Sequence, residues 1–197
     1  MVKAIRGYGE IKTGQVDAGI KNLSEAGAWF ANFRLQYTSS RYVPWLAEGH
    51  LRRGNRDAAR SLLEAVLATS REAGYAQLEG LACWLIGECL AAEAPAAAEP
   101  NVETAMGILE RIGARNDLAR AMITRAALRQ TAGDVATARA LLDRARAIFY
   151  ELGTLDEPAR IEAARVALDS GSPIPLLASV GQRIARPWVC PRTDRSL

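Results

Sequence analysis

The chain has 197 residues, of which 49% are hydrophobic and 24% are charged, so it is long enough to form one substantial soluble unit. Alanine, leucine, arginine and glutamate dominate and aromatic residues make up only 6%, a composition that favours helices over sheets. The net charge of +3 arises in residues 172–197, whereas residues 1–171 are neutral. The basic face or stripe that is typical of a nucleic-acid binder is not visible in this body, so we expect no nucleic-acid binding through it.

The sequence predicts nine helices, which we take in chain order. The expected ranges are 2–13, 15–36, 40–53, 56–73, 77–93, 101–113, 116–132, 135–152 and 156–170. Glycines follow several of them: we expect Gly14, Gly54 and Gly133 to end the first helix of a pair, and Gly74 and Gly153 to end the second, each in a left-handed backbone conformation.

The helices fall into repeats of about 40 residues. GNRDAARSLLEAVLATSREAG begins at Gly54, and GDVATARALLDRARAIFYELG at Gly133 matches it in length, bounding glycines and leucine pair. A small residue recurs at intervals of 40, 40 and 39, and in three of the four units it is followed by a small residue, a leucine and a modest apolar residue. These small residues are Gly7, Ala47, Gly87 and Ala126. Small side chains let two helix axes approach closely, so the spacing predicts tight helical hairpins.

The third unit fits this register only with a six-residue insertion, which we assign to APAAAEP at 94–100. Its Pro- and Ala-rich composition, between two expected helices, predicts a protruding loop. Ala105, Leu109 and Ile112 then take the three apolar positions of the second helix.

The pattern of small residues, bulky apolar residues and alanine over residues 4–168 resembles the tetratricopeptide repeat (TPR) family, although the period is about 40 rather than 34 and no proline closes the second helix. The segments LAEGHLRRGNRDAARSLLEAVLATSREAG, LACWLIGECLAA and ETAMGILERIGARNDLARAMITRAALRQTAGDVATARALLDRARAIFYELG are similar to the C-terminal TPR region of bacterial regulators that carry an adenylate/guanylate cyclase-type or DNA-binding module and an AAA-type ATPase. The resemblance implies an all-α fold: a right-handed α-solenoid of about four TPR-like hairpins plus a capping helix. Arg125 and Arg129 depart from the family pattern, which predicts either a rotated helix or a polar contact between helices.

The repeats are expected to make one domain, residues 1–171, followed by a basic, Pro-containing and largely irregular tail, residues 172–197. Within the tail, LLASVGQRIA has the pattern of a short amphipathic helix that covers the last hairpin.

Catalytic, metal and membrane chemistry are disfavoured. GYGEIKTG at 7–14 contains Lys12 and Thr13, but the order of residues is not that of a phosphate-binding loop and no strand precedes it. Cysteines at 83, 89 and 190 lack metal or disulfide spacing, and His50 is the only histidine. No apolar leader or window of ~18 apolar residues is present. We expect a cytoplasmic protein that is not an enzyme and has no metal, no cofactor and no membrane contact.

The first helix of each hairpin is implied to line a concave inner face, and extended concave surfaces are what such solenoids use for binding. An inward stripe is defined by the positions six and three before the small residue and one, four and five after it. Its candidate binding residues are Arg41, Glu48, Arg52, Trp84, Glu88 and Arg120, a mixed-charge groove with an aromatic anchor. The alternative is that Trp84 belongs to the core and the charges are solvated.

Three functional hypotheses follow. The first is a protein-protein interaction or sensor module of a bacterial signalling system, which binds a partner peptide or helix in the groove. The second is an effector-sensing domain of a larger cyclase or transcription regulator, with a small ligand in the same groove. The third, a small enzyme, lacks a convergent set of catalytic groups. Trp29, Phe30 and Phe33 cover the first hairpin or form an apolar patch that pairs two copies, so a homo-oligomer is also considered.

Overall fold

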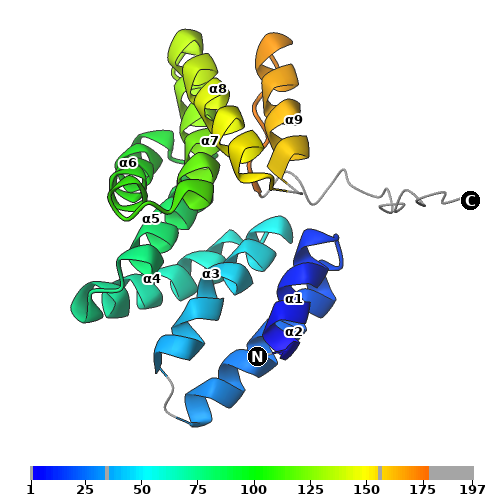
Figure 1. The fold of residues 1–197 in the computed structure, drawn as a ribbon, viewed down its shortest axis with the longest axis vertical. Helices are drawn as coiled ribbons and strands as arrows, with labels where there is room; N and C mark the ends of the chain where they lie inside the picture. Colours follow the sequence, from blue (N-terminus) through cyan, green and yellow to red (C-terminus); the bar gives the residue numbers. More distant parts are fainter. Residues whose placement is uncertain (1, 34–35, 155–156, 178–197) are drawn as a thin grey trace, which may run out of the picture.

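The computed structural model describes residues 2–33, 36–154 and 157–177, and all the regular structure in these ranges is helical (Figure 1). The helices are α1 (Val2–Lys12), α2 (Val16–Asn32), α3 (Gln36–Arg52), α4 (Arg56–Ala73), α5 (Ala76–Leu90), α6 (Pro95–Arg111), α7 (Arg115–Thr131), α8 (Val135–Leu152) and α9 (Glu157–Asp169). The expected all-α class and all nine expected helices are therefore confirmed. No helix in the described ranges combines the length and hydropathy that a membrane span requires.

Each helix packs against the next one along the chain, and a second set of contacts joins the odd-numbered helices. In this set α1 contacts α3, α3 contacts α5, α5 contacts α7, and α7 contacts α9. The even-numbered helices form no equivalent row among the described residues, and each lies mainly against its neighbours in the sequence. The odd-numbered helices therefore form a continuous layer, which we call the inner row, and the arrangement is repetitive along the chain (Figure 1).

The turn between paired helices comes from two adjacent residues with different roles. Gly54 ends α3 with a φ of 83°, a left-handed conformation that glycine adopts without a steric penalty. The next residue, Asn55, caps α4 by accepting a hydrogen bond from the backbone N–H of Ala58. Gly133 and Asp134 repeat the same arrangement before α8. The predicted glycine stops are confirmed at all five positions.

The close helix contacts predicted from the small residues are also confirmed. Gly7, Ala47, Gly87 and Ala126 are all buried. A methyl group on Gly87 would lie 2.4 Å from Cγ2 of Val102 in α6, a distance that real Cβ atoms do not show. On Gly19 of α2 it would lie 2.5 Å from the backbone oxygen of Gly7. At these points the helix axes approach so closely that only a small residue fits.

The prediction of an insertion at 94–100 is wrong. Pro95 is instead the first residue of α6, a position where proline's missing N–H costs nothing, and the alanines after it favour a helix. Ala98 takes the small position, because the close neighbours of Gly87 are the side chain of Val102 and the backbone oxygen of Ala98. Ile112 is 40% exposed rather than a core residue.

In the true register the two small residues of the third pair, Gly87 and Ala98, lie one residue closer in sequence than those of the other pairs. The second helix of every pair buries four equivalent positions. These positions are Gly19, Leu23, Ala26 and Phe30 in α2; Ala59, Leu63, Val66 and Ser70 in α4; Ala98, Val102, Ala105 and Leu109 in α6; and Ala138, Leu142, Ala145 and Phe149 in α8.

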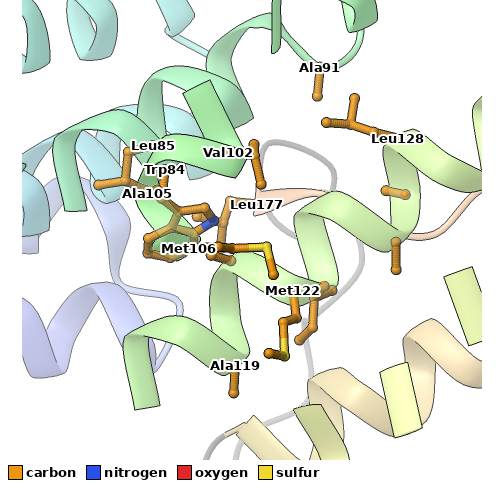
Figure 2. Packing of buried hydrophobic residues seen from close by; sticks show 14 of the residues in the cluster. Trp84, Leu85, Ala91, Val102, Ala105, Met106, Ala119, Met122, Leu128 and Leu177 are labelled. Atoms are coloured by element: carbon orange, nitrogen blue, oxygen red, sulfur yellow. The ribbon is translucent and has the colours of Figure 1, made fainter. Parts of the chain in front are cut away.

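The buried apolar residues form one large cluster from Ala47 to Leu177 and a smaller one around the first hairpin. Figure 2 shows part of the large cluster, with Trp84 of α5 and Met122 of α7 among residues from several helices. Ile174 and Leu177, from the first residues of the expected tail, also belong to this core. Most of the short helix expected at 176–185, and the basic residues of the tail, lie outside the described ranges.

Candidate binding cavity

The six candidate residues all lie on the inner row, but the structure gives them different surroundings. Arg41, Glu48 and Arg52 come from α3, Trp84 and Glu88 from α5, and Arg120 from α7. Trp84, Glu48, Glu88 and Arg120 are at most 4% exposed. The side chain of Arg52 is 13% exposed, and Arg41 is the exposed member of the six. Most of the stripe is therefore neither an open groove nor a set of solvated charges.

Glu48 is the centre of a buried ion-pair network. Its carboxylate lies 2.6 Å from Nη2 of Arg120, 3.0 Å from Nη2 of Arg52 and 3.2 Å from Nζ of Lys12. Burial acts to raise the pKa of Glu48, but the three cations outweigh it and hold the pKa well below its ordinary value. Glu48 therefore stays ionised although it is buried.

Arg120 extends this network to the last helix. Its Nε lies 3.0 Å from Oε1 of Glu157 in α9, and its guanidinium lies 4.5 Å from the centre of a Trp84 ring. Glu157 also pairs with Lys12, at 3.4 Å. This contact joins α1 to α9 although the two residues are 145 positions apart in the sequence. Arg160 of α9 completes the chain of contacts. We use "ion-pair network" for Lys12, Glu48, Arg52, Glu88, Asp117, Arg120, Glu157 and Arg160.

Trp84 is a core residue with a satisfied polar atom. Its Nε1 donates a hydrogen bond to Oγ1 of Thr124 at 2.8 Å, and that hydroxyl donates to Oε1 of Glu88 at 2.5 Å. Glu88 also accepts a hydrogen bond from the backbone N–H of Leu177 and pairs with Arg160. Trp84 is fully buried and therefore links α5 to α7 from within the core.

Beside the network lies a cavity of about 390 Å³, which we call the inner cavity. Its walls come from α1, α3, α5 and the N-terminal turns of α7, and they combine aromatic residues with charged ones. The lining residues that matter most are Tyr8, Arg41, Trp45, Tyr75, Asn116 and Asp117, together with Trp84 and Arg120.

One wall is a pair of stacked aromatic rings. The rings of Tyr8 and Trp45 have centroids 4.5 Å apart and an interplanar angle of 18°. Lys12 lies 5.3 Å from the centre of the Tyr8 ring. Burial and, next, the charge of Glu48 raise the pKa of Tyr8, so its phenol stays neutral.

The part of the lining that comes from α7 carries acceptors on the first turns of that helix. Among the described residues, Asp117 accepts one hydrogen bond, from Nε2 of Gln77 at 3.3 Å, and pairs with one cation, Arg120, at 4.0 Å. Burial raises the pKa of Asp117 despite that cation. Asn116 has a buried Oδ1 with no hydrogen-bond partner among the described residues. The cavity thus presents two acceptors that are poorly supplied with donors.

Sequence reasoning missed several of these residues, although the same stripe contains them. The rule for the inward positions, applied to the first unit, selects Tyr8 and Lys12, one and five residues after Gly7. Extended one helical turn towards the N-terminus in the fourth unit, it selects Asn116 and Asp117. Glu157 and Arg160 lie 40 residues after Asp117 and Arg120, so α9 continues the inner row.

The two unusual arginines of the fourth unit make a polar contact between helices, one of the two outcomes expected for them. Arg125 lies 3.3 Å from Glu99 and 3.1 Å from Glu103, both on α6, and Arg129 also pairs with Glu99.

At the first hairpin, Trp29 and Phe33 are 55% and 60% exposed, whereas Phe30 is buried.

The remaining reactive side chains do not converge on the cavity. Cys83 and Cys89 are buried and unpaired, and burial raises the pKa of Cys89 to about 12, so its thiol stays protonated. No group of three or more histidine, cysteine, aspartate or glutamate side chains is arranged to hold a metal in the described ranges. The chemistry that this arrangement offers is recognition by stacking, hydrogen bonding and charge.

A search of family models, of curated proteins and of solved structures found no match to this chain.

Proposed function

We propose that the chain is a non-enzymatic TPR-like interaction module, a right-handed α-solenoid of four hairpins and a final helix, that serves a cytoplasmic bacterial signalling system. The support is the 40-residue repetition of helix pairs together with the continuous inner row of odd-numbered helices. In this proposal the module binds a segment of a partner protein in the inner cavity.

The observation that carries this proposal is the inner cavity itself, whose lining residues come from four helices of different repeats. A site assembled by several repeats is the usual way in which helical-repeat proteins bind. A volume of about 390 Å³ fits a few side chains of an extended segment. A whole helix, about 10–12 Å across, needs a longer open groove, and the ion-pair network occupies that space here. We therefore favour an extended segment over a helix.

A second candidate function uses the same cavity for a small effector, with the chain acting as the sensing part of a larger cyclase or transcription regulator. Small-molecule sites commonly have volumes of about 300–1,000 Å³, so the cavity lies within that range.

The proposal is tested by filling the cavity. Ala76 lines the cavity in the first turn of α5, so Ala76→Phe places a ring in it. Ala136→Phe is the matched control, because Ala136 occupies the first turn of α8, is exposed and does not line the cavity. A displayed library of random peptides is selected on the wild-type protein, and the enriched peptides are titrated against both variants. We expect Ala76→Phe to weaken binding at least about tenfold, and Ala136→Phe to leave it unchanged.

Enriched peptides that bind Ala76→Phe as tightly as the wild-type protein would overturn the proposed site. A thermal-shift screen of a metabolite set addresses the second candidate. If a metabolite stabilises the wild-type protein, Ala76→Phe abolishes that stabilisation and no peptide is enriched, then the second candidate function, sensing of a small effector, takes the place of the first.

A further inference from the structure

We infer that the inner cavity selects a positively charged group, an ammonium or a guanidinium, that donates hydrogen bonds to Asp117 and Asn116 while it lies against the aromatic wall of Tyr8 and Trp45. The inference rests on the proposed function, since it names the chemistry that the same cavity recognises.

The acceptors of the cavity are the first line of support. A carboxylate has room for about four hydrogen bonds, yet within the described ranges Asp117 receives one, from a neutral amide, and lies 4.0 Å from the guanidinium of Arg120. The buried Oδ1 of Asn116 receives none from the described residues. Buried acceptors without donors are costly, so a ligand that brings several N–H donors gains more here than one that brings acceptors.

Glu48 and Asp117, the two carboxylates that line the cavity, differ in the number of cationic groups beside them. Glu48 lies within 3.2 Å of three cationic groups, and these hold its pKa low. Asp117 has no such set, and burial raises its pKa instead. A bound cation would supply the missing partner for Asp117 and would add nothing for Glu48.

The aromatic wall is the second line of support. Cations bind favourably over the faces of tyrosine and tryptophan rings, with Arg favoured for its planar guanidinium. The chain already uses this contact twice around the cavity, with Arg120 over Trp84 and Lys12 over Tyr8. Trp45 also lines the cavity and is only partly buried.

The arginine side chains already at the cavity do not exclude a positively charged ligand. Arg120 is neutralised by Glu48 and Glu157, and the whole ion-pair network holds equal numbers of positive and negative groups. Arg41 is exposed at the cavity, where water and salt screen its charge. Asp117 also lies in the first turn of α7, where it offsets the positive end of the helix dipole.

The test uses calorimetric titration of the whole chain with capped tripeptides that share glycine at both ends and differ at the centre. The centre is arginine, citrulline as its neutral isostere, or glutamate, and agmatine, which carries a guanidinium and an ammonium, serves as a small free cation. We expect the arginine peptide to bind about tenfold or more tightly than the citrulline peptide, and the glutamate peptide to bind more weakly still. Equal or tighter binding of the citrulline or glutamate peptide, or no binding of the arginine peptide, would overturn the inference.

Asp117→Asn tests the residue. We expect this variant to lose about tenfold in affinity for the arginine peptide and to bind the citrulline peptide as the wild-type protein does. Asp57→Asn is the matched control, because Asp57 lies in the first turn of α4, is exposed and is remote from the cavity. Unchanged affinity of Asp117→Asn for arginine would refute the assignment, and circular dichroism checks that each variant is folded.

Two further comparisons complete the test. One separates a free cation from a cationic residue of a partner segment, and the other separates failure of the charge assignment from failure of the proposed function. Agmatine that binds as tightly as the arginine peptide identifies a free cation as sufficient, whereas binding of the peptide alone requires a partner segment. If the selected peptides depend on Ala76 but show no preference for arginine or lysine, the charge assignment fails and the proposed function stands. If Ala76→Phe affects no binding at all, both fail.

Discussion

At the scale of single residues, the buried charges are held in place by their partners. Glu48 is 1% exposed, and a lone carboxylate in that position would lose several kcal/mol of hydration. Three cations from α1, α3 and α7 compensate for this loss. Removing Glu48 leaves three buried or half-buried cations with fewer partners, since only Lys12 and Arg120 keep their contact with Glu157. An incompletely paired buried charge is more damaging than removal of the whole set.

We therefore expect Glu48→Gln to destabilise the fold by about 3–5 kcal/mol near neutral pH. Because the pKa of Glu48 is lower in the folded state than the ordinary 4.5, its contribution is fully present above about pH 4.5 and is lost as the pH falls through the folded value. The difference between wild type and variant should thus shrink in acid. Urea unfolding at several pH values measures it. Glu64→Gln, which removes an exposed pair with Arg60, is the control and should leave the midpoint unchanged.

At the scale of the elements, the closeness of paired helices depends on where a glycine lies. α2 contains two glycines in its interior, Gly19 and Gly27. A Cβ on Gly19 would meet the backbone oxygen of Gly7 at 2.5 Å, whereas a Cβ on Gly27 would meet nothing within 4 Å. One helix thus offers a crowded glycine and an uncrowded one.

Gly19→Ala should destabilise the protein by about 1–3 kcal/mol, since the nearest atom belongs to the backbone of α1 and the two helices must move apart. Gly27→Ala should stabilise it by about 0.5–1 kcal/mol, because alanine has the higher helix propensity and no clash opposes it. Thermal unfolding of the pair measures both signs. Two variants with the same sign would contradict the argument.

At the scale of the whole molecule, Glu157 connects the last helix to the first one. It pairs with Arg120 at 3.0 Å and with Lys12 at 3.4 Å, so α9 is held by α7 and α1 together. The apolar contacts of α9, through Ile161 and Ala164, are made with the same core. Charge contacts therefore add to apolar packing where the two ends of the described chain meet.

Glu157→Gln should loosen α9 selectively. We expect the backbone amides of α9 to exchange with deuterium about tenfold faster or more, while those of α5 and α6, in the middle of the core, keep their protection. Glu162→Gln is the control on the same helix, because Glu162 pairs with Arg146 in a half-exposed position. Equal effects of the two variants would show that Glu157 acts no differently from a surface charge.

The sequence by itself determined the helices, their glycine stops and the close contacts at Gly7, Ala47, Gly87 and Ala126. These features depend on local backbone preferences and on a period that recurs four times, so neighbouring residues carry the signal. The register of the third pair was misjudged because Ala- and Pro-rich residues suit both a loop and a helix start. Contact with Gly87 decided in favour of the helix.

Only the tertiary structure decided how the charges of the inner row pair and where the cavity lies. The sequence placed Glu48, Glu88 and Arg120 on one stripe, but a stripe does not tell whether water or another helix covers it. That depends on how the row of odd-numbered helices curves, which brings Lys12 and Glu157 together across 145 residues. Curvature accumulates from small rotations at each hairpin contact, and no short segment of sequence encodes their sum.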